Sequence, residues 1–167
     1  MLLSFGGIIG NFSSDSEASV RDCYNTGEVS GTYGEAGGII GRLYNSISTN
    51  KISSCYNVGN VSASHDAGSI IGKGNNANLN NCRWTATLQN AVGLEENPAT
   101  MENNTGVITK EDLKVYADSL ETLENIEGTE NLELTDWWGN DELVEGSEAE
   151  YKYNNGYPVL NWQKVSY

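Results

Sequence analysis

Gly37-Gly38-Ile39-Ile40-Gly41 is the stretch that decides the fold, because closely similar words stand before it and after it. The identical word occupies residues 6–10, 31 residues earlier, and residues 68–72 repeat it 31 residues later with serine as the second residue. A fixed period of this size is typical of repeat proteins, in which each unit buries its apolar face only against its neighbours. Glycines around a β-branched pair predict a very short strand between tight corners, where a residue without Cβ can adopt positive φ.

A second motif lies between the glycine words and is aligned on the three cysteines. An apolar residue stands three positions before each cysteine, giving the pairs Val20 and Cys23, Ile52 and Cys55, and Leu79 and Cys82. Tyr-Asn follows the first two cysteines, and a glycine and then a β-branched residue come shortly after, at 27–29 and 59–61. Each period therefore offers three short strands separated by Gly, Asn and Ser corners.

Three strands per coil, repeated in register, predict an all-β parallel β-helix (β-solenoid) of about two and a half to three coils, with equivalent positions stacked about 4.8 Å apart. The cysteines would form one inward column of reduced thiols, because a free Cys is small and usually buried. Their odd number and equivalent positions argue against a disulfide framework. Asn25 and Asn57 predict an amide ladder at a corner. A propeller or sandwich would need longer alternating strands and hairpin turns.

The repeat pattern ends after Trp84, where the composition becomes acidic. The net charge is −14; residues 1–90 contain five Lys/Arg and six Asp/Glu, whereas residues 91–167 contain four and seventeen. We therefore expect a solenoid over 1–90 and an acidic capping region over 91–167. In the capping region, a capping-box-like start and apolar residues at helical spacing predict one helix over about 110–124. Residues 154–162 predict a turn into a terminal strand, which Pro158 confines to an edge.

The charge and composition also exclude several classes of partner. An acidic surface repels phosphate backbones and anionic lipid, so we expect no nucleic-acid partner. No apolar run approaches the roughly 20 residues of a membrane span, which predicts no membrane insertion. Residues 1–5 lack the basic start and the length of a signal peptide, and we expect the chain to begin within a repeat.

The residues that carry common enzyme chemistry lack the required spacing. His65 is the only histidine, so the His-Glu-x-x-His site of a zinc peptidase cannot form, and no nucleophile elbow accompanies it. The cysteines have no Cys-x-x-Cys spacing for zinc, and a column of thiols cannot surround an ion. We therefore expect no enzyme activity, no catalytic residue, no cofactor and no metal site. Incidental calcium binding by the acidic tail stays open, as does a glycan-active enzyme, although such β-helix enzymes bind their polymer across many coils.

Candidate ligand contacts come from the segments whose length varies between repeats. The distance from the first glycine of the word to the cysteine is 17, 18 and 14 residues in the three repeats. A length change marks a loop, so we expect variable turns over 11–19, 42–51 and 73–78, along one edge of the solenoid. The candidate contacts in these turns are Ser13, Asn45 and Asn76. Trp137 and Trp138 are further candidates that could stack on sugar rings, although a cap over the solenoid end also needs large apolar side chains.

The glycine word, with Cys-Tyr-Asn-x-Gly-x-Val between its copies, resembles the GLUG-motif repeats of bacterial surface proteins. The resemblance covers residues 6–72 and extends loosely to Trp84, and Asn-Gly-Tyr-Pro-Val-Leu-x-Trp at 155–162 is similar to a segment that often ends such arrays. Ser69 and Arg83-Trp84 depart from the family pattern. The motif contains no active-site residue that could be carried over.

This resemblance implies a non-catalytic extracellular module of a cell-surface or secreted protein, acting in adhesion, ligand binding or spacing. Its partners would be a host or matrix glycan or protein and other domains of the same full-length protein. The alternative is an accessory segment of a larger secreted enzyme, a metallopeptidase or a glycan-active enzyme, whose catalytic domain lies outside this chain.

Overall fold

The structure is a computed structural model, and it describes residues 3–14, 18–45, 51–84, 88, 90–96, 100–102, 105–106, 138–139 and 159–160. These residues form β-strands and the corners between them, and no helix occurs among them. The chain divides into two units, Met1–Ile108 and Thr109–Tyr167. Each unit is described by itself.

The first unit is built from strands that recur in the same order along the chain, and one passage through this order is called a coil. Coil 1 contains β1 (Leu3–Gly6), β2 (Ile9–Ser14), β3 (Ser19–Arg21), β4 (Tyr24–Asn25) and β5 (Val29–Gly31). Coil 2 contains β6 (Gly34–Gly37), β7 (Ile40–Asn45), β8 (Lys51–Ser53), β9 (Tyr56–Asn57) and β10 (Val61–Ala63). Coil 3 contains β11 (Ala67–Gly68), β12 (Ile71–Asn75), β13 (Asn78–Asn80) and β14 (Arg83–Trp84), and β15 (Val92–Glu95), β16 (Thr100–Glu102) and β17 (Thr105–Gly106) follow.

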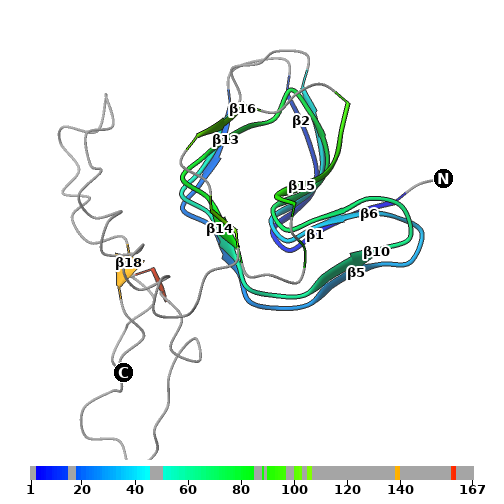
Figure 1. The fold of residues 1–167 in the computed structure, drawn as a ribbon, viewed down its shortest axis with the longest axis horizontal. Helices are drawn as coiled ribbons and strands as arrows, with labels where there is room; N and C mark the ends of the chain where they lie inside the picture. The colour runs from blue at the N-terminus through cyan, green and yellow to red at the C-terminus, as the bar shows by residue number, and fades with distance from the viewer. Residues whose placement is uncertain are drawn as a thin grey trace, which may run out of the picture. The chain divides into compact units, whose positions relative to one another are not determined.

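Equivalent strands of successive coils pair in parallel and form five sheets. Sheet A is β1-β6-β11, sheet B is β2-β7-β12-β15, sheet C is β3-β8-β13-β16, sheet D is β4-β9-β14-β17, and sheet E is β5-β10. In sheet B, for example, Ile9, Ile40, Ile71 and Val92 stand in one row. Figure 1 shows the coils lying over one another, with sheets B, C and D enclosing one loop of chain and sheets A and E forming a flatter loop beside it. The arrangement is consistent with the expected parallel β-helix.

The number of strands per coil differs from the sequence-based prediction, which was three and is five in coils 1 and 2. One reason is a sharp corner inside the cysteine motif. Asp22, Ser54 and Asn81 each precede a cysteine, and their φ values of 53°, 53° and 55° lie in the left-handed region. A left-handed residue turns the chain abruptly, so that what reads as one strand in the sequence becomes two, in sheets C and D.

The stacked sheets also extend beyond residue 90, where the sequence analysis placed the start of the capping region. Strands β15, β16 and β17 add a fourth strand to sheets B, C and D, so among the described residues these sheets hold one strand more than the three glycine words supply. The word is present there in a reduced form, Ala91-Val92-Gly93, in which Val92 pairs with Ile71. It stands 21 rather than 31 residues after its predecessor, which conceals it from a search at fixed period.

Glycines of the word are required for close approach and not for positive φ, contrary to the expectation. A Cβ on Gly72 would lie 2.6 Å from the carbonyl carbon and oxygen of Ala36, and its φ is outside the left-handed region. Sheets A and B therefore meet backbone against backbone at the third glycine of the word, which bends the chain between the two loops of Figure 1.

The interior contains two apolar clusters. The larger one is formed mainly by residues of sheets B, C and D, and its fully buried members include Ile39, Ile40, Leu43, Ile52, Cys55, Ile70, Ile71, Leu79 and Cys82. The smaller one consists of Val29, Ala36 and Val61, with Phe5, Ala63, Ala67 and Leu88 packed against them. Both glycine-word isoleucines of coil 2 point into the larger cluster.

The predicted amide ladder is confirmed. Asn25 Nδ2 donates to Asn57 Oδ1 at 2.9 Å, and each side chain also bonds the backbone of the glycine two residues later. The aromatic rings before these asparagines, Tyr24 and Tyr56, stack with centroids 5.2 Å apart. Asparagine is therefore kept at this corner because its amide satisfies backbone groups of the turn.

In the second unit the structure describes one pair of short strands. β18 (Trp138–Gly139) and β19 (Val159–Leu160) are antiparallel, with Trp138 opposite Leu160. β19 lies within the segment for which a terminal strand was predicted, and that strand is confirmed. The helix predicted over about 110–124 lies outside the described residues.

Candidate functional site

The structure brings three of the predicted contact residues to the same end of sheet B. Ser13 stands in β2 and is exposed, Asn45 is the last residue of β7, and Asn76 directly follows β12 with a φ of 55°. Ser13 and Asn45 therefore belong to strands, and the expectation of turns over 11–19 and 42–51 is corrected: strands β2 and β7 continue through residues 14 and 45. Trp138 lies in β18, and Trp137 lies outside the described residues.

A row of side chains that the sequence analysis missed lies beside these residues. Tyr44 stands between Ser13 and Asn75 in register, and it is 50% exposed although its neighbour Leu43 is only 1% exposed. Two positions earlier in the strands, Arg42 stands between Asn11 and Lys73. We call these six residues the outer face of sheet B. The in–out alternation of Leu43 and Tyr44 was the available signal, but it was read as part of a turn.

Ion pairs hold both cationic side chains of the outer face. Lys73 Nζ lies 2.7 Å from Glu96 Oε1, and this contact lowers the pKa of the Glu96 carboxyl group. Arg42 Nη1 lies 3.8 Å from Oε1 of Glu35, which is buried and also accepts a hydrogen bond from Ser4 Oγ at 3.2 Å. The outer face thus combines an exposed aromatic ring with fixed donors and with amide and hydroxyl groups, which is the composition that polar ligands such as sugars use.

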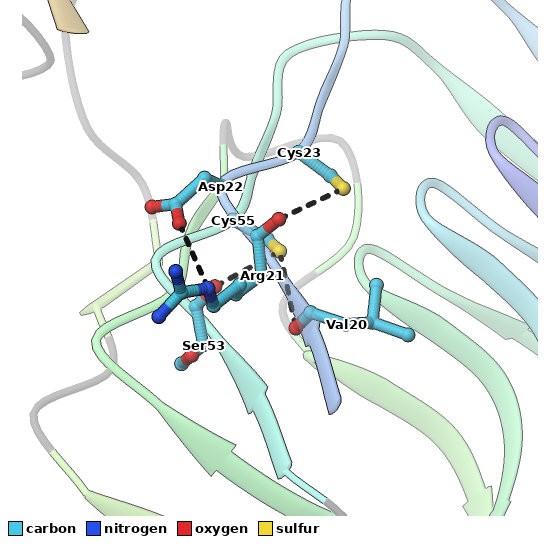
Figure 2. A network of polar contacts seen from close by, with 6 residues as sticks. All are labelled: Val20, Arg21, Asp22, Cys23, Ser53 and Cys55. Carbon is cyan, nitrogen blue, oxygen red and sulfur yellow. Dashed lines mark hydrogen bonds and ion pairs between the residues drawn. The ribbon is translucent and has the colours of Figure 1, made fainter. Parts of the chain in front are cut away.

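The cysteines form the predicted column of free thiols, with a difference in burial along it. Cys55 and Cys82 are fully buried, whereas Cys23 is only partly buried because it belongs to coil 1, which has a neighbouring coil on one side only. Figure 2 shows the thiol groups of Cys23 and Cys55 directed at backbone carbonyl groups; Cys23 Sγ lies 3.2 Å from Arg21 O and Cys55 Sγ lies 3.2 Å from Ser53 O.

Neighbouring thiols in the column shift each other's proton affinity in opposite directions. The pKa of Cys55 is raised well above its ordinary value, first because its proton is shared in hydrogen bonds with Cys23 and Cys82 and then because it is buried. The pKa of Cys23 is lowered, because the hydrogen bond from Cys55 stabilises its thiolate more than burial and Asp22 oppose it. Cys23 is therefore the accessible and more easily ionised thiol of this pair.

Replacing Cys55 by alanine is expected to make Cys23 react more slowly with iodoacetamide near pH 7.5. The substitution removes the hydrogen-bond donor, so the pKa of Cys23 rises and less thiolate is present at a given pH. The measurement is the alkylation rate of Cys23 as a function of pH, followed by mass spectrometry. We expect the midpoint to move to higher pH. Cys82→Ala, which leaves the Cys23–Cys55 contact intact, is the control; an unchanged midpoint in Cys55→Ala contradicts the coupling.

Two further observations bear on the kind of site. Among the residues that the structure describes, no group of three or more His, Cys, Asp or Glu side chains is placed to hold a metal ion. Within the same residues, no helix has the length and apolar character needed to cross a bilayer.

Comparison with known proteins adds no relative whose site could be superposed on this one. No protein-family model matches the chain, and neither a curated protein nor a solved structure shows significant similarity to it.

Proposed function

We propose that this chain is a non-catalytic repeat module of a bacterial cell-surface or secreted protein, related to the GLUG-motif repeats, that binds a host or matrix ligand or spaces other domains of the same protein. The proposal includes a parallel β-helix closed at its C-terminal end by the acidic region. The observation that carries it is the outer face of sheet B, where Tyr44 is half exposed in a row with Ser13 and Asn75.

The repeated residues of the first unit have roles in packing, and the outer-face residues do not. Ile39, Ile40 and Ile70 fill the larger apolar cluster, Asn25 and Asn57 satisfy the backbone at their corner, and the thiols of the column contact carbonyl groups. Tyr44 differs because half of its surface faces solvent from the middle of a regular strand. An exposed aromatic ring on a rigid scaffold favours a binding role.

The outer face also supports binding over catalysis. Its two cations are held by carboxylates, and the buried one, Glu35, is engaged by both Ser4 and Arg42. A general acid or base needs a proton position open toward a substrate, and Glu35 is only 1% exposed. We therefore favour a ligand that is held by stacking and hydrogen bonds and is released unchanged.

The test is a binding screen of the full chain, multimerised on beads, against host glycans and matrix proteins. Contacts of one small module are weak, so avidity is needed for detection. For a ligand found in this screen, Tyr44→Ala is expected to reduce affinity about tenfold, which corresponds to about 1.4 kcal/mol. Tyr33→Ala is the matched control, because Tyr33 is 71% exposed but lies outside sheet B.

The outcome that contradicts the proposal is enzymatic turnover. Glycan and immunoglobulin substrates are incubated with the same chain, and turnover that one carboxylate substitution abolishes would show an enzyme. A ligand whose affinity falls with Tyr33→Ala but not with Tyr44→Ala would place the binding surface elsewhere. The alternative, an accessory segment of a larger secreted enzyme, predicts binding to the substrate of a neighbouring catalytic domain.

A further inference from the structure

A different surface, the open edge of coil 1, carries the further inference. Each of the five strands β1 to β5 is the outermost strand of its sheet, so coil 1 presents a continuous row of strand edges. Leu3 and Ile8 are 40% and 48% exposed there. Open strand edges invite pairing with another chain segment, and three features of this edge show what kind of segment fits.

The first feature is a glycine with no steric reason inside this chain. Gly59 of coil 2 is buried, and a Cβ on it would lie 1.9 Å from the carbonyl oxygen of Gly27 in coil 1, so it must be glycine. Gly27 occupies the equivalent position in coil 1, but the nearest atom to its Cβ would be its own corner's Asn25 Oδ1, at 3.6 Å. The space that a carbonyl group occupies above Gly27 in the next coil is vacant below it.

The third glycine of the word shows the same asymmetry. Added Cβ atoms on Gly41 and Gly72 would lie 2.6 Å and 2.5 Å from the carbonyl oxygen of the equivalent glycine one coil earlier. Gly10 is the equivalent residue of coil 1, and the nearest atom to its Cβ would be Ser4 O at 3.1 Å. Two glycines of coil 1 thus leave room that only a preceding coil would fill.

The third feature is the direction of the backbone hydrogen bonds between coils. Val58 N donates to Asn25 O, and Ser64 N donates to Gly31 O, both at 3.0 Å, so these donors of coil 2 point toward coil 1. Thr26 and Thr32 hold the equivalent positions 32 residues earlier and are exposed. Their N–H groups therefore point toward the open edge, where acceptors of a further coil would stand.

We propose that the open edge of coil 1 is a docking surface for one further coil of the same repeat, running parallel to coil 1 and in register with it. Its carbonyl groups would occupy the space beside Gly27 and Gly10 and would accept from Thr26 and Thr32.

A second copy of the chain fits this edge less well. Two copies related by a two-fold axis would pair their edges antiparallel, which breaks the register of glycine against carbonyl. In a head-to-tail arrangement the last strands of one copy, β15 to β17 among the described residues, belong to sheets B, C and D, and they offer no partner for β1 or β5. A coil that contains all five strands is the occupant that matches the whole edge.

The test uses the full chain with a copy of residues 34–64 inserted between Leu2 and Leu3. This insert is one period of 31 residues, so it presents a complete five-strand coil in the register that coil 2 has on coil 1. Hydrogen exchange of the Thr26 and Thr32 amides is expected to slow by on the order of 100-fold in the extended chain. Val58 and Ser64 are the reference amides, because their acceptors are present in both proteins.

Gly27→Ala supplies the second readout. In the parent chain the substitution should leave the melting temperature nearly unchanged, because the added Cβ meets no atom closer than 3.6 Å. In the extended chain it should remove the new protection of Thr26, because the Cβ would meet the carbonyl of the inserted coil as it does at Gly59. Gly59→Ala, which is expected to destabilise both proteins, is the matched control.

Three results would overturn the proposal. Thr26 and Thr32 could exchange at the parent rate in the extended chain, or the extended chain could fail to fold under conditions where the parent folds. Protection of these amides in the parent that rises with protein concentration would assign the edge to a second copy instead.

Discussion

Gly41→Ala is expected to abolish the folded state of the first unit. A Cβ on Gly41 would lie 2.6 Å from three backbone atoms, Gly10 O, Phe5 N and Phe5 O, which belong to two different strands of coil 1. Backbone atoms in paired strands cannot withdraw without breaking their sheets. We therefore expect a loss of more than about 4 kcal/mol, which is a large share of the roughly 5–15 kcal/mol that stabilises a typical domain.

The matched control is Gly10→Ala at the same position of the first glycine word. Its Cβ would approach only Ser4 O, at 3.1 Å, which asks for a shift of a few tenths of an ångström. We expect a cost of about 1 kcal/mol. Urea unfolding followed by circular dichroism measures both variants at equal protein concentration. Equal stabilities for Gly41→Ala and Gly10→Ala would show that sheets A and B do not meet as described.

Asn57→Ala is expected to cost more than about 3 kcal/mol, the second largest effect. Asn57 is buried and makes three hydrogen bonds: its Nδ2 donates to Gly59 O at 3.0 Å, and its Oδ1 accepts from Gly59 N at 3.1 Å and from Asn25 Nδ2 at 2.9 Å. Alanine leaves the buried backbone groups of Gly59 without these partners, and each buried unsatisfied group costs about 1–3 kcal/mol. A cavity beside Gly38 adds to the loss, because Asn57 fills that space.

Asn25→Ala tests whether burial is the cause. Asn25 makes the same two bonds to its own corner, at Gly27, but this corner is exposed and water can replace the lost partner. We expect a cost of about 1 kcal/mol. The comparison is made by chemical denaturation, with the change in free energy of unfolding as the measured quantity. If the two variants lose equal stability, the amide ladder does not act through buried hydrogen bonds.

The rows of sheets B, C and D could be predicted from the sequence because equivalent residues recur at a fixed distance. Val20, Ile52 and Leu79 were aligned by their spacing from the cysteines, and the structure pairs them in one row of sheet C. The corners between the strands could not be predicted in the same way. Their left-handed residues differ in type, and Ser54 is not a residue that signals positive φ.

The candidate site was predicted only in its location along sheet B. Ser13, Asn45 and Asn76 were chosen because their segments vary in length, and these residues do lie at one end of that sheet. Tyr44 was missed because its exposure depends on which face of β7 turns outward. That choice is made by the neighbouring Leu43, which enters the larger apolar cluster, and by Gly41, which faces sheet A.

The sequence by itself determined the repeat, the parallel pairing of equivalent residues and the inward column of thiols, because a 31-residue period places chemically identical side chains over one another. Only the tertiary structure decided that each full coil has five strands in two loops and that a further strand set follows Trp84. The physical reason is that these features depend on backbone approaching backbone. Gly72 meets Ala36, and Gly93 meets Ala67, across sheets that are adjacent in space and leave no periodic signal in the chain.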